Sequence, residues 1–101
     1  MATILATCAN GAGSSLLMKM AIDNVVQELG MYVTKVHHCS LAEGKSTAKN
    51  FDIIFCPLNF KSMFADAEKS GIPVIGLKNV MSAAEIKKNI IELGLDVKFK
   101  K

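Results

Sequence analysis

Four short apolar segments, separated by stretches with helical spacing, constrain the fold of this 101-residue chain most strongly. They are residues 3–7, 31–36, 51–56 and 74–77, and each is rich in β-branched or aromatic side chains. Segments of this length and composition are typical of strands, and nearly continuous apolar runs are typical of strands buried on both faces of a sheet. Strands that alternate with helices form right-handed βαβ units, in which the strands are parallel. We therefore expect a small doubly wound α/β domain.

Three helices are expected between and after these strands. Residues 14–29 and 59–70 repeat apolar residues at helical spacing, and a last helix begins after Ser82, with Glu85 at the spacing of a capping box. The side chains expected to face the core are Leu16, Met20, Val26 and Leu29 in the first helix, and Ile86, Ile90 and Leu93 in the last.

Two segments carry a weaker signal. Residues 41–50 have little pattern and are expected to form a loop with one or two helical turns. The tail, residues 96–101, is expected to fray. The whole chain, residues 1–101, is then a single domain with a four-stranded parallel sheet in the order 2-1-3-4 and helices on both faces. Ligands bind to such sheets at the carboxyl ends of the strands, where the winding reverses. Cys8 follows the first strand at that edge.

The charges and apolar runs exclude two classes of partner. The chain has twelve lysines, no arginine and nine acidic residues, for a net charge of +3, and aromatic residues make up 6% of it. The sequence has no basic block long enough to follow a phosphate backbone and no set of aromatic side chains that could stack on bases, so nucleic-acid binding is not expected. We interpret Lys19 and Lys78 as solvated side chains. The apolar runs fall far short of the roughly 20 residues that span a bilayer. With no basic segment of a signal peptide, we expect a cytoplasmic protein that does not insert into the membrane.

The cysteines and histidines do not predict a metal centre. Cys8, Cys39 and Cys56 are an odd number at wide spacing, which fits neither a disulfide framework nor a Cys-x-x-Cys metal site. We expect thiols, with Cys39 and Cys56 packed in the core. His37 and His38 are adjacent on a strand, so their side chains point to opposite faces. That placement favours a surface or edge role over a phosphohistidine or a metal-binding pair, and no metal or other cofactor is expected.

The loop after the first strand carries the strongest functional signal. A thiol stands at its start, and two glycines allow the backbone to curl so that loop N–H groups and the helix N-terminus point at one anion. The predicted nucleophile is Cys8, and the predicted phosphate-binding residues are Ala9, Asn10, Gly11, Ala12, Gly13, Ser14 and Ser15. The loop has neither the Walker A nor the Rossmann spacing, so nucleotide binding is not expected. The structural alternative is a tight strand–helix turn with Cys8 as a small core residue.

One known class with a nucleophilic cysteine in such a loop consists of low-molecular-weight tyrosine phosphatases and the related arsenate reductases. Their loop is Cys-x5-Arg, and an Asp-Pro pair supplies the general acid. Here Ser14 stands at the arginine position, and the chain contains neither arginine nor an Asp-Pro pair. The bidentate clamp and the proton donor are both missing, so efficient hydrolysis is not expected.

A second class matches more of the chain. Residues 6–20 (ATCANGAGSSLLMKM), together with residues 52–54 and 76–82, resemble the IIB components of bacterial sugar phosphotransferase systems, closest to the ascorbate-type branch. The resemblance implies a phosphoryl carrier in which Cys8 takes phosphate from a phosphohistidine on a IIA component. It further implies transfer of that phosphate to a sugar, ascorbate in this branch, that is held by a membrane IIC component. The alternatives are a relative of the phosphatases or arsenate reductases and a noncatalytic binding module.

Overall fold

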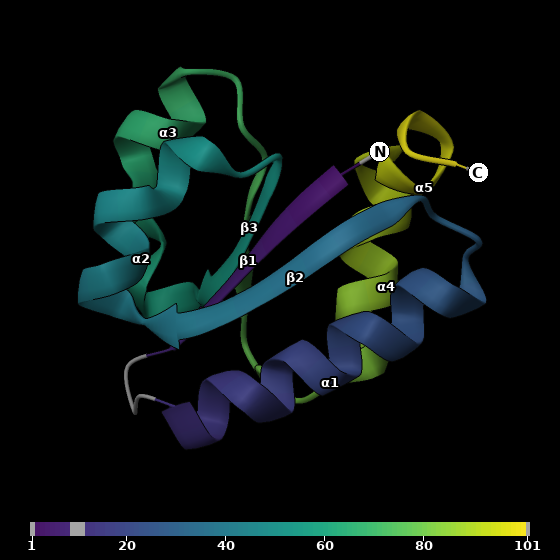
Figure 1. Ribbon diagram of the computed structural model, residues 1–101, viewed down its shortest axis with the longest axis horizontal. Coiled ribbons are helices and arrows are strands. Elements are labelled where there is room, and N and C mark those ends of the chain that lie inside the picture. Colours follow the sequence, from purple (N-terminus) through teal and green to yellow (C-terminus); the bar gives the residue numbers. More distant parts are fainter. Residues whose placement is uncertain (1, 9–11, 101) are drawn as a thin grey trace.

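The strands form one parallel sheet. The computed structural model describes residues 2–8 and 12–100. Within these, β1 (Ala2–Cys8), β2 (Val33–Ser40), β3 (Ile53–Pro57) and β4 (Val74–Leu77) pair in the order β2-β1-β3-β4, which confirms the predicted doubly wound arrangement. β1 therefore has a hydrogen-bonded neighbour on each side, and β2 is an edge strand (Figure 1).

Helices cover both faces of the sheet (Figure 1). α1 (Ala12–Glu28) and α4 (Ala83–Glu92) pack on one face, and α2 (Leu41–Thr47), the 3-10 helix η2 (Leu58–Phe64) and α3 (Ala65–Lys69) pack on the other. Two shorter elements, η1 (Ala48–Asn50) and α5 (Leu95–Lys98), follow α2 and α4.

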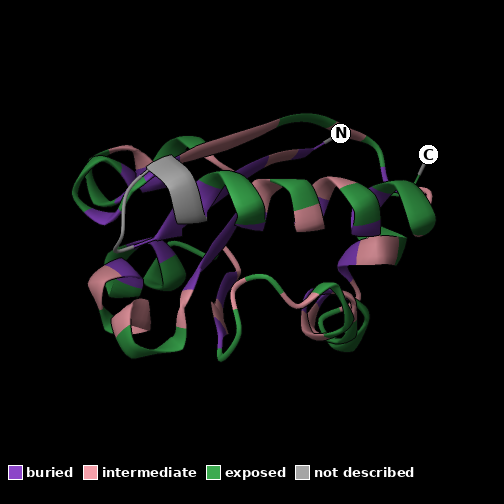
Figure 2. Ribbon diagram, turned by 90° about the horizontal axis from the view of Figure 1, so that it is seen from below, coloured by how far each residue is buried: buried purple, intermediate pink, exposed green. Residues whose placement is uncertain are grey.

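The core is divided in two by the sheet, because successive strand residues point to opposite faces. Along β1, Ile4 and Ala6 join the cluster under α1 and α4, whereas Leu5 joins the cluster under α2 and α3. β3 divides in the same way, with Phe55 on the first face and Ile54 on the second. Buried residues run along the strands and the inward sides of the helices, and exposed residues lie on the outer sides (Figure 2).

The second strand lies further along the chain than the sequence pattern indicates. Residues 31–36 were the expected strand, and β2 is Val33–Ser40 instead. Its partner β1 continues to Cys8, which pairs with Ser40, so the hydrogen-bond ladder carries β2 through three polar residues before the turn. An edge strand tolerates these polar side chains because part of its surface faces solvent.

The first helix buries a different stripe from the expected one. Met18, Ile22 and Val25 are buried, whereas Leu16 and Met20 are 43% and 53% exposed. α1 carries apolar residues around most of its circumference, so spacing alone does not decide which stripe faces the sheet. Val26 is buried and Leu29 partly buried, as expected.

The end of the chain also differs from expectation. The expected fraying of residues 96–101 is wrong for residues 96–100, because Leu95 is buried and starts α5, Phe99 packs on the core, and Lys100 forms a bridge with Met31. Leu93, expected on the inner face, is 55% exposed, and Leu95 takes the buried position after the turn at Gly94.

Two further segments differ from expectation in their helical content. Residues 41–50, expected to be a loop with one or two helical turns, are helical throughout, because α2 is followed directly by η1. The helix expected over residues 59–70 is split, since its first part is the 3-10 helix η2 and only Ala65–Lys69 is α-helical.

The turn between β4 and α4 depends on one carboxylate. Glu85 accepts hydrogen bonds from the backbone N–H groups of Lys78 (2.8 Å) and Asn79 (2.9 Å), and its own N–H donates to the Ser82 hydroxyl oxygen (3.2 Å). Ser82 is the N-cap of α4, which confirms the predicted capping residue. The side chain of Glu85 thus connects the carboxyl end of β4 to the helix that follows.

Replacing this carboxylate should destabilise the fold. We expect Glu85→Ala to lower the free energy of unfolding by about 1–3 kcal/mol, because two backbone N–H groups lose a charged acceptor. Urea denaturation followed by circular dichroism measures the change. Glu92→Ala on the same helix is the control, because Glu92 lies 4.0 Å from Lys88 at an exposed site, and its loss should be below about 0.5 kcal/mol. Equal losses for the two variants would contradict this account of the turn.

Candidate functional site

Cys8 is the last residue of β1, at the carboxyl edge of the sheet. A hydrogen-bonded strand lies on each side of β1, and Cys8 pairs with Ser40 of β2. The side chain is 4% exposed and belongs to the cluster beneath α1 and α4. The thiol therefore stands at the end of a strand whose position the sheet determines, on the same face as the helix that follows it.

The predicted anion-binding loop leads directly into α1. Ala9, Asn10 and Gly11 lie outside the described residues. Ala12, Gly13 and Ser14 form the first turn of α1, so the helix begins two residues earlier than the expected residue 14. The first turn of a helix has N–H groups without intrahelical partners, and the helix dipole favours negative charge there. α1 has no acidic residue in this turn, so no side-chain carboxylate competes for the position.

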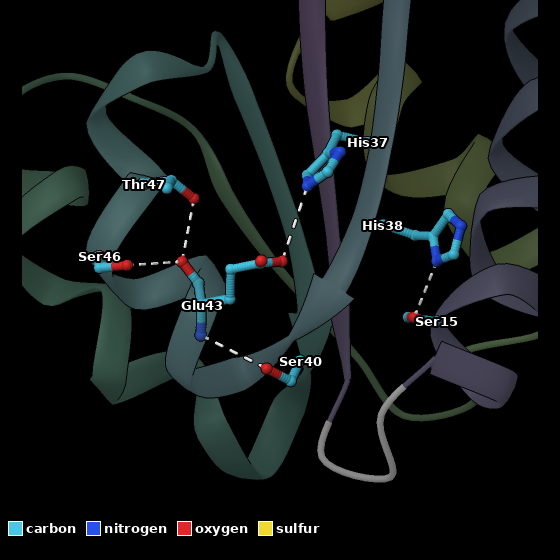
Figure 3. Close-up of polar contacts among 7 residues, drawn as sticks. All are labelled: Ser15, His37, His38, Ser40, Glu43, Ser46 and Thr47. Carbon is cyan, nitrogen blue, oxygen red and sulfur yellow. Dashed lines mark hydrogen bonds and ion pairs between the residues drawn. The ribbon is translucent and has the colours of Figure 1, made fainter.

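The structure places one further residue, His38, beside the predicted site. Ser15 is completely buried, and its Oγ lies 3.2 Å from Nδ1 of His38, a hydrogen-bonding distance (Figure 3). The contact joins the start of α1 to β2. Sequence reasoning assigned His38 an edge role and did not connect it to the loop. The predicted pairing of the first two strands could have indicated this contact, because it brings residues near position 40 to the level of Cys8.

The neighbouring histidine faces the other way, as predicted (Figure 3). His37 Nε2 lies 3.7 Å from a carboxylate oxygen of Glu43, and its ring stacks on Phe51 with centroids 6.0 Å apart. His37 thus belongs to the face covered by α2. The two histidines form no pair, and only His38 approaches the start of α1.

The other two cysteines are buried on the face opposite to Cys8. Desolvation by burial, together with a hydrogen bond to Glu43 and its negative charge, raises the pKa of Cys39 to about 11. The Thr7 hydroxyl lies beside the Cys39 sulfur and acts weakly in the opposite direction. Burial raises the pKa of Cys56 to about 12. The expectation that Cys39 and Cys56 are packed thiols is confirmed.

The contacts of Lys19 do not indicate a role in phosphate binding. Its ammonium group forms an ion pair with Asp23 one turn further along α1, at 2.7 Å. The pair satisfies the charge of Lys19 on the surface of the helix, in agreement with the interpretation of this side chain as solvated.

The fold and the cysteine position define a class of protein. A small doubly wound α/β domain, with a thiol at the end of its central strand and a long helix starting just beyond, is suited to carrying an anionic group on sulfur. The model of the family of lactose/cellobiose-specific IIB subunits of the phosphotransferase system matches residues 3–92. The chain belongs to this family. It is a phosphoryl carrier and a phosphotransferase, since IIB components act through a phosphocysteine.

Curated relatives of similar length carry a different sugar in their names. The ascorbate-specific EIIB component of Mycoplasma pneumoniae is 36% identical over 84 residues, which are 83% of this chain and 85% of that protein. The ascorbate-specific EIIB component of Salmonella typhimurium is 31% identical over 90 residues, covering 89% and 86% of the two chains.

A solved structure has the same fold. The lactose-specific IIB component domain from Streptococcus pneumoniae superposes with a TM-score of 0.66 at 19% identity, covering 89% of this chain and 94% of that one. None of the helices in residues 2–8 and 12–100 combines the length and apolarity that crossing a bilayer requires.

The raised pKa values predict that two thiols react slowly. A pKa of about 11 in place of 9.0 lowers the thiolate fraction of Cys39 at neutral pH by about 100-fold, and the fraction falls further for Cys56. Alkylation of the folded chain by iodoacetamide, located by peptide mass spectrometry, should leave both residues largely unmodified while the urea-unfolded chain reacts at all three cysteines. Equal rates for Cys39 in the folded and unfolded chain would disprove its burial as a protonated thiol.

Proposed function

We propose that Cys8 is the residue that carries the phosphoryl group. The observation that supports it is the position of Cys8 at the carboxyl end of the central strand, before the N-terminus of a 17-residue helix. The family acts through a phosphocysteine. Cys39 and Cys56, the other two cysteines of the sequence, are buried on the opposite face with raised pKa values.

In the proposed cycle the donor is a phosphohistidine on a IIA component. The Cys8 sulfur attacks phosphorus, a P–S bond forms, the P–N bond breaks, and the thiol proton passes to the released imidazole or to solvent. A sugar hydroxyl, held by the membrane IIC component, then attacks phosphorus, the P–S bond breaks, and the hydroxyl proton passes to the released Cys8 thiolate or to solvent. Both steps take place in the cytoplasm and depend mainly on positioning and on stabilisation of the equatorial phosphoryl oxygens. The proposed cycle requires neither a metal ion nor a nucleotide.

The residues proposed to bind the phosphoryl group are those from Ala9 to Ser15. Backbone N–H groups of the loop and of the first turn of α1 are the main donors to the phosphoryl oxygens. Ser15 contributes a hydroxyl, and His38 acts as a positioning residue because its Nδ1 lies 3.2 Å from that oxygen. A binding site formed mainly by the backbone suits a carrier, since it stabilises the phosphoryl group without supplying the general acid that would assist hydrolysis.

The phosphatase alternative lacks its essential groups. The sequence has no arginine to clamp the phosphoryl group and no Asp-Pro acid, so a phosphocysteine here has no evident route to rapid hydrolysis. A carrier requires such persistence, because its phosphocysteine must survive until the acceptor arrives.

We propose ascorbate as the sugar. The support is the name shared by the curated relatives at 31–36% identity, which cover more than four fifths of the chain. The lactose-specific structure is 19% identical and supports the fold alone.

Labelling with a radioactive phosphoryl group tests the proposed role of Cys8. Incubation with the phosphorylated IIA component of an ascorbate system should add one phosphoryl group to the wild-type chain and none to Cys8→Ser. Cys39→Ser, once its folding is verified, is the control and should be labelled like wild type. Equal labelling of Cys8→Ser would disprove the assignment, and rapid turnover of an aryl phosphate by wild type would favour the phosphatase alternative.

The same labelled chain tests the sugar. Membranes that contain the ascorbate IIC component should release the label as ascorbate phosphate, whereas membranes with a lactose-type IIC component should not release it on lactose. Transfer to lactose alone would replace ascorbate in the proposal and leave the role of Cys8 intact.

The start of α1 offers a surface for the partner proteins. Leu16, Leu17 and Met20 are between 43% and 53% exposed, and they lie within the first turns of the helix that follows the Cys8 loop. A partner that delivers a phosphoryl group to Cys8 must approach this end of the sheet. We therefore propose that these three residues contact the IIA component.

Substitution of one of them should weaken that contact. We expect Leu17→Ser to raise the KM for the phosphorylated IIA component by roughly tenfold, because about 1.5 kcal/mol of apolar burial is lost from the complex. Ile91→Ser is a matched control, since Leu17 and Ile91 are each 48% exposed and Ile91 lies near the end of α4. An equal KM for Leu17→Ser and wild type would exclude Leu17 from the interface.

A further inference from the structure

The corner between β2 and α2 gathers three side chains that can ligate a metal. His37 and Cys39 are two residues apart on β2, so they point to the same face, and Glu43 belongs to the first turn of α2. One ligand atom from each residue lies within 4.8 Å of the other two, and His37 Nε2 is 3.7 Å from Glu43 Oε2. The neighbouring His38 points to the opposite face, toward Ser15 (Figure 3).

We propose that His37, Cys39 and Glu43 form a binding site for a divalent cation of the zinc class. Tetrahedral Zn²⁺, with bonds of about 2.0–2.3 Å to nitrogen, oxygen and sulfur, spaces its ligand atoms roughly 3.3–3.8 Å apart. The 3.7 Å between His37 and Glu43 already has this spacing. The side chains of His37 and Glu43 are 39% and 59% exposed, so they are able to rotate toward Cys39, and water completes the coordination.

Contacts with neighbouring residues place the three ligands at one corner of the sheet. Ser40 caps α2, and its hydroxyl oxygen accepts the N–H of Glu43 at 3.4 Å, which places Glu43 at the end of β2 (Figure 3). The ring of His37 stacks on Phe51 with an interplanar angle of 14°. Cys39 is held in the strand ladder opposite Thr7. Metal binding therefore requires the ordering of only two partly exposed side chains.

A buried hydroxyl beside the sulfur supports the proposal independently. Thr7 is completely buried, and its Oγ1, which lies beside the Cys39 sulfur, makes no hydrogen bond of ordinary geometry within the described residues. Metal binding replaces the S–H bond of Cys39 by a sulfur–metal bond, the proton leaves to solvent, and no electron is transferred. The resulting thiolate sulfur is an acceptor for the Thr7 O–H. Outer hydrogen bonds of this kind orient metal ligands in many sites.

The donor set selects the class of cation. One imidazole nitrogen, one thiolate and one carboxylate suit Zn²⁺ and its spectroscopic substitute Co²⁺, whereas Mg²⁺ and Ca²⁺ take oxygen ligands. A bound cation would connect the end of β2 to α2 next to Ser40, the residue that pairs with Cys8. The site stands apart from the phosphoryl-transfer proposal, because its ligands lie on the opposite face from Ser15 and His38.

Titration with Co²⁺ tests the site in the full-length Cys8→Ser variant, which removes the thiol of the loop. We expect one Co²⁺ per chain, a thiolate-to-cobalt charge-transfer band, displacement by Zn²⁺ and no displacement by Mg²⁺. Adding Glu43→Gln or His37→Gln to this variant should weaken binding by at least about tenfold. Adding His38→Gln is the matched control and should leave the affinity unchanged.

Three results would overturn the proposal. They are the absence of a charge-transfer band, an unchanged Co²⁺ affinity in Glu43→Gln, and a band that is present in wild type but lost in Cys8→Ser. Cys39→Ser alters a buried position and can unfold the chain, so Glu43→Gln is the decisive variant. Its substitution leaves the cap of α2 intact, because the cap uses the backbone N–H of Glu43 and not its side chain. As a second measurement, Zn²⁺ should raise the Tm of wild type and of His38→Gln but not that of Glu43→Gln.

Discussion

The parallel pairing of β1 with a strand on each side is the interaction on which the rest of the structure depends. Leu5 of β1 is buried under α2 and α3, and Ala6 is buried under α1 and α4, so the strand is enclosed in all directions. Backbone hydrogen bonds and packing together determine where Cys8 ends the strand. The sheet thus fixes the position of Cys8 at its carboxyl edge, opposite Ser40 of β2.

The alternation of side chains along the strands separates two kinds of chemistry. Cys8 and His38 face the side covered by α1, where a helix N-terminus favours negative charge. Cys39 and His37 face the side covered by α2, beside the carboxylate of Glu43, where a cation is favoured. Adjacent residues of one edge strand thus face the start of α1 on one side of the sheet and the cluster of His37, Cys39 and Glu43 on the other.

The same arrangement explains why a single cysteine suits phosphoryl transfer. Burial keeps Cys39 and Cys56 as protonated thiols by raising the pKa of each well above its ordinary value. Cys8 lies on the opposite face of the sheet from these two thiols, at the end of β1 and four residues before the start of α1. Position in the fold, rather than the type of residue, distinguishes the three cysteines.

The sequence by itself determined the α/β class, the strand order, the position of Cys8 at a strand end and the capping of α4 by Ser82. The class, the strand end and the cap depend on local periodicity and on turn and cap residues, which are read over a few positions, and the strand order follows from the rules for βαβ units. The bounds of the loop proposed to bind an anion were predicted in the same way, and its residues 9–11 lie outside the described part of the chain.

Only the tertiary structure decided which stripe of α1 is buried, how far β2 extends, and where the last residues of the chain pack. It also brought Ser15 to His38, and Glu43 to His37 and Cys39. Each of these outcomes depends on the pairing of β1 with β2 or on packing between segments far apart in the sequence. Local patterns contain no information on register, and a helix that is apolar around most of its circumference acquires an inner face only when it packs on the sheet.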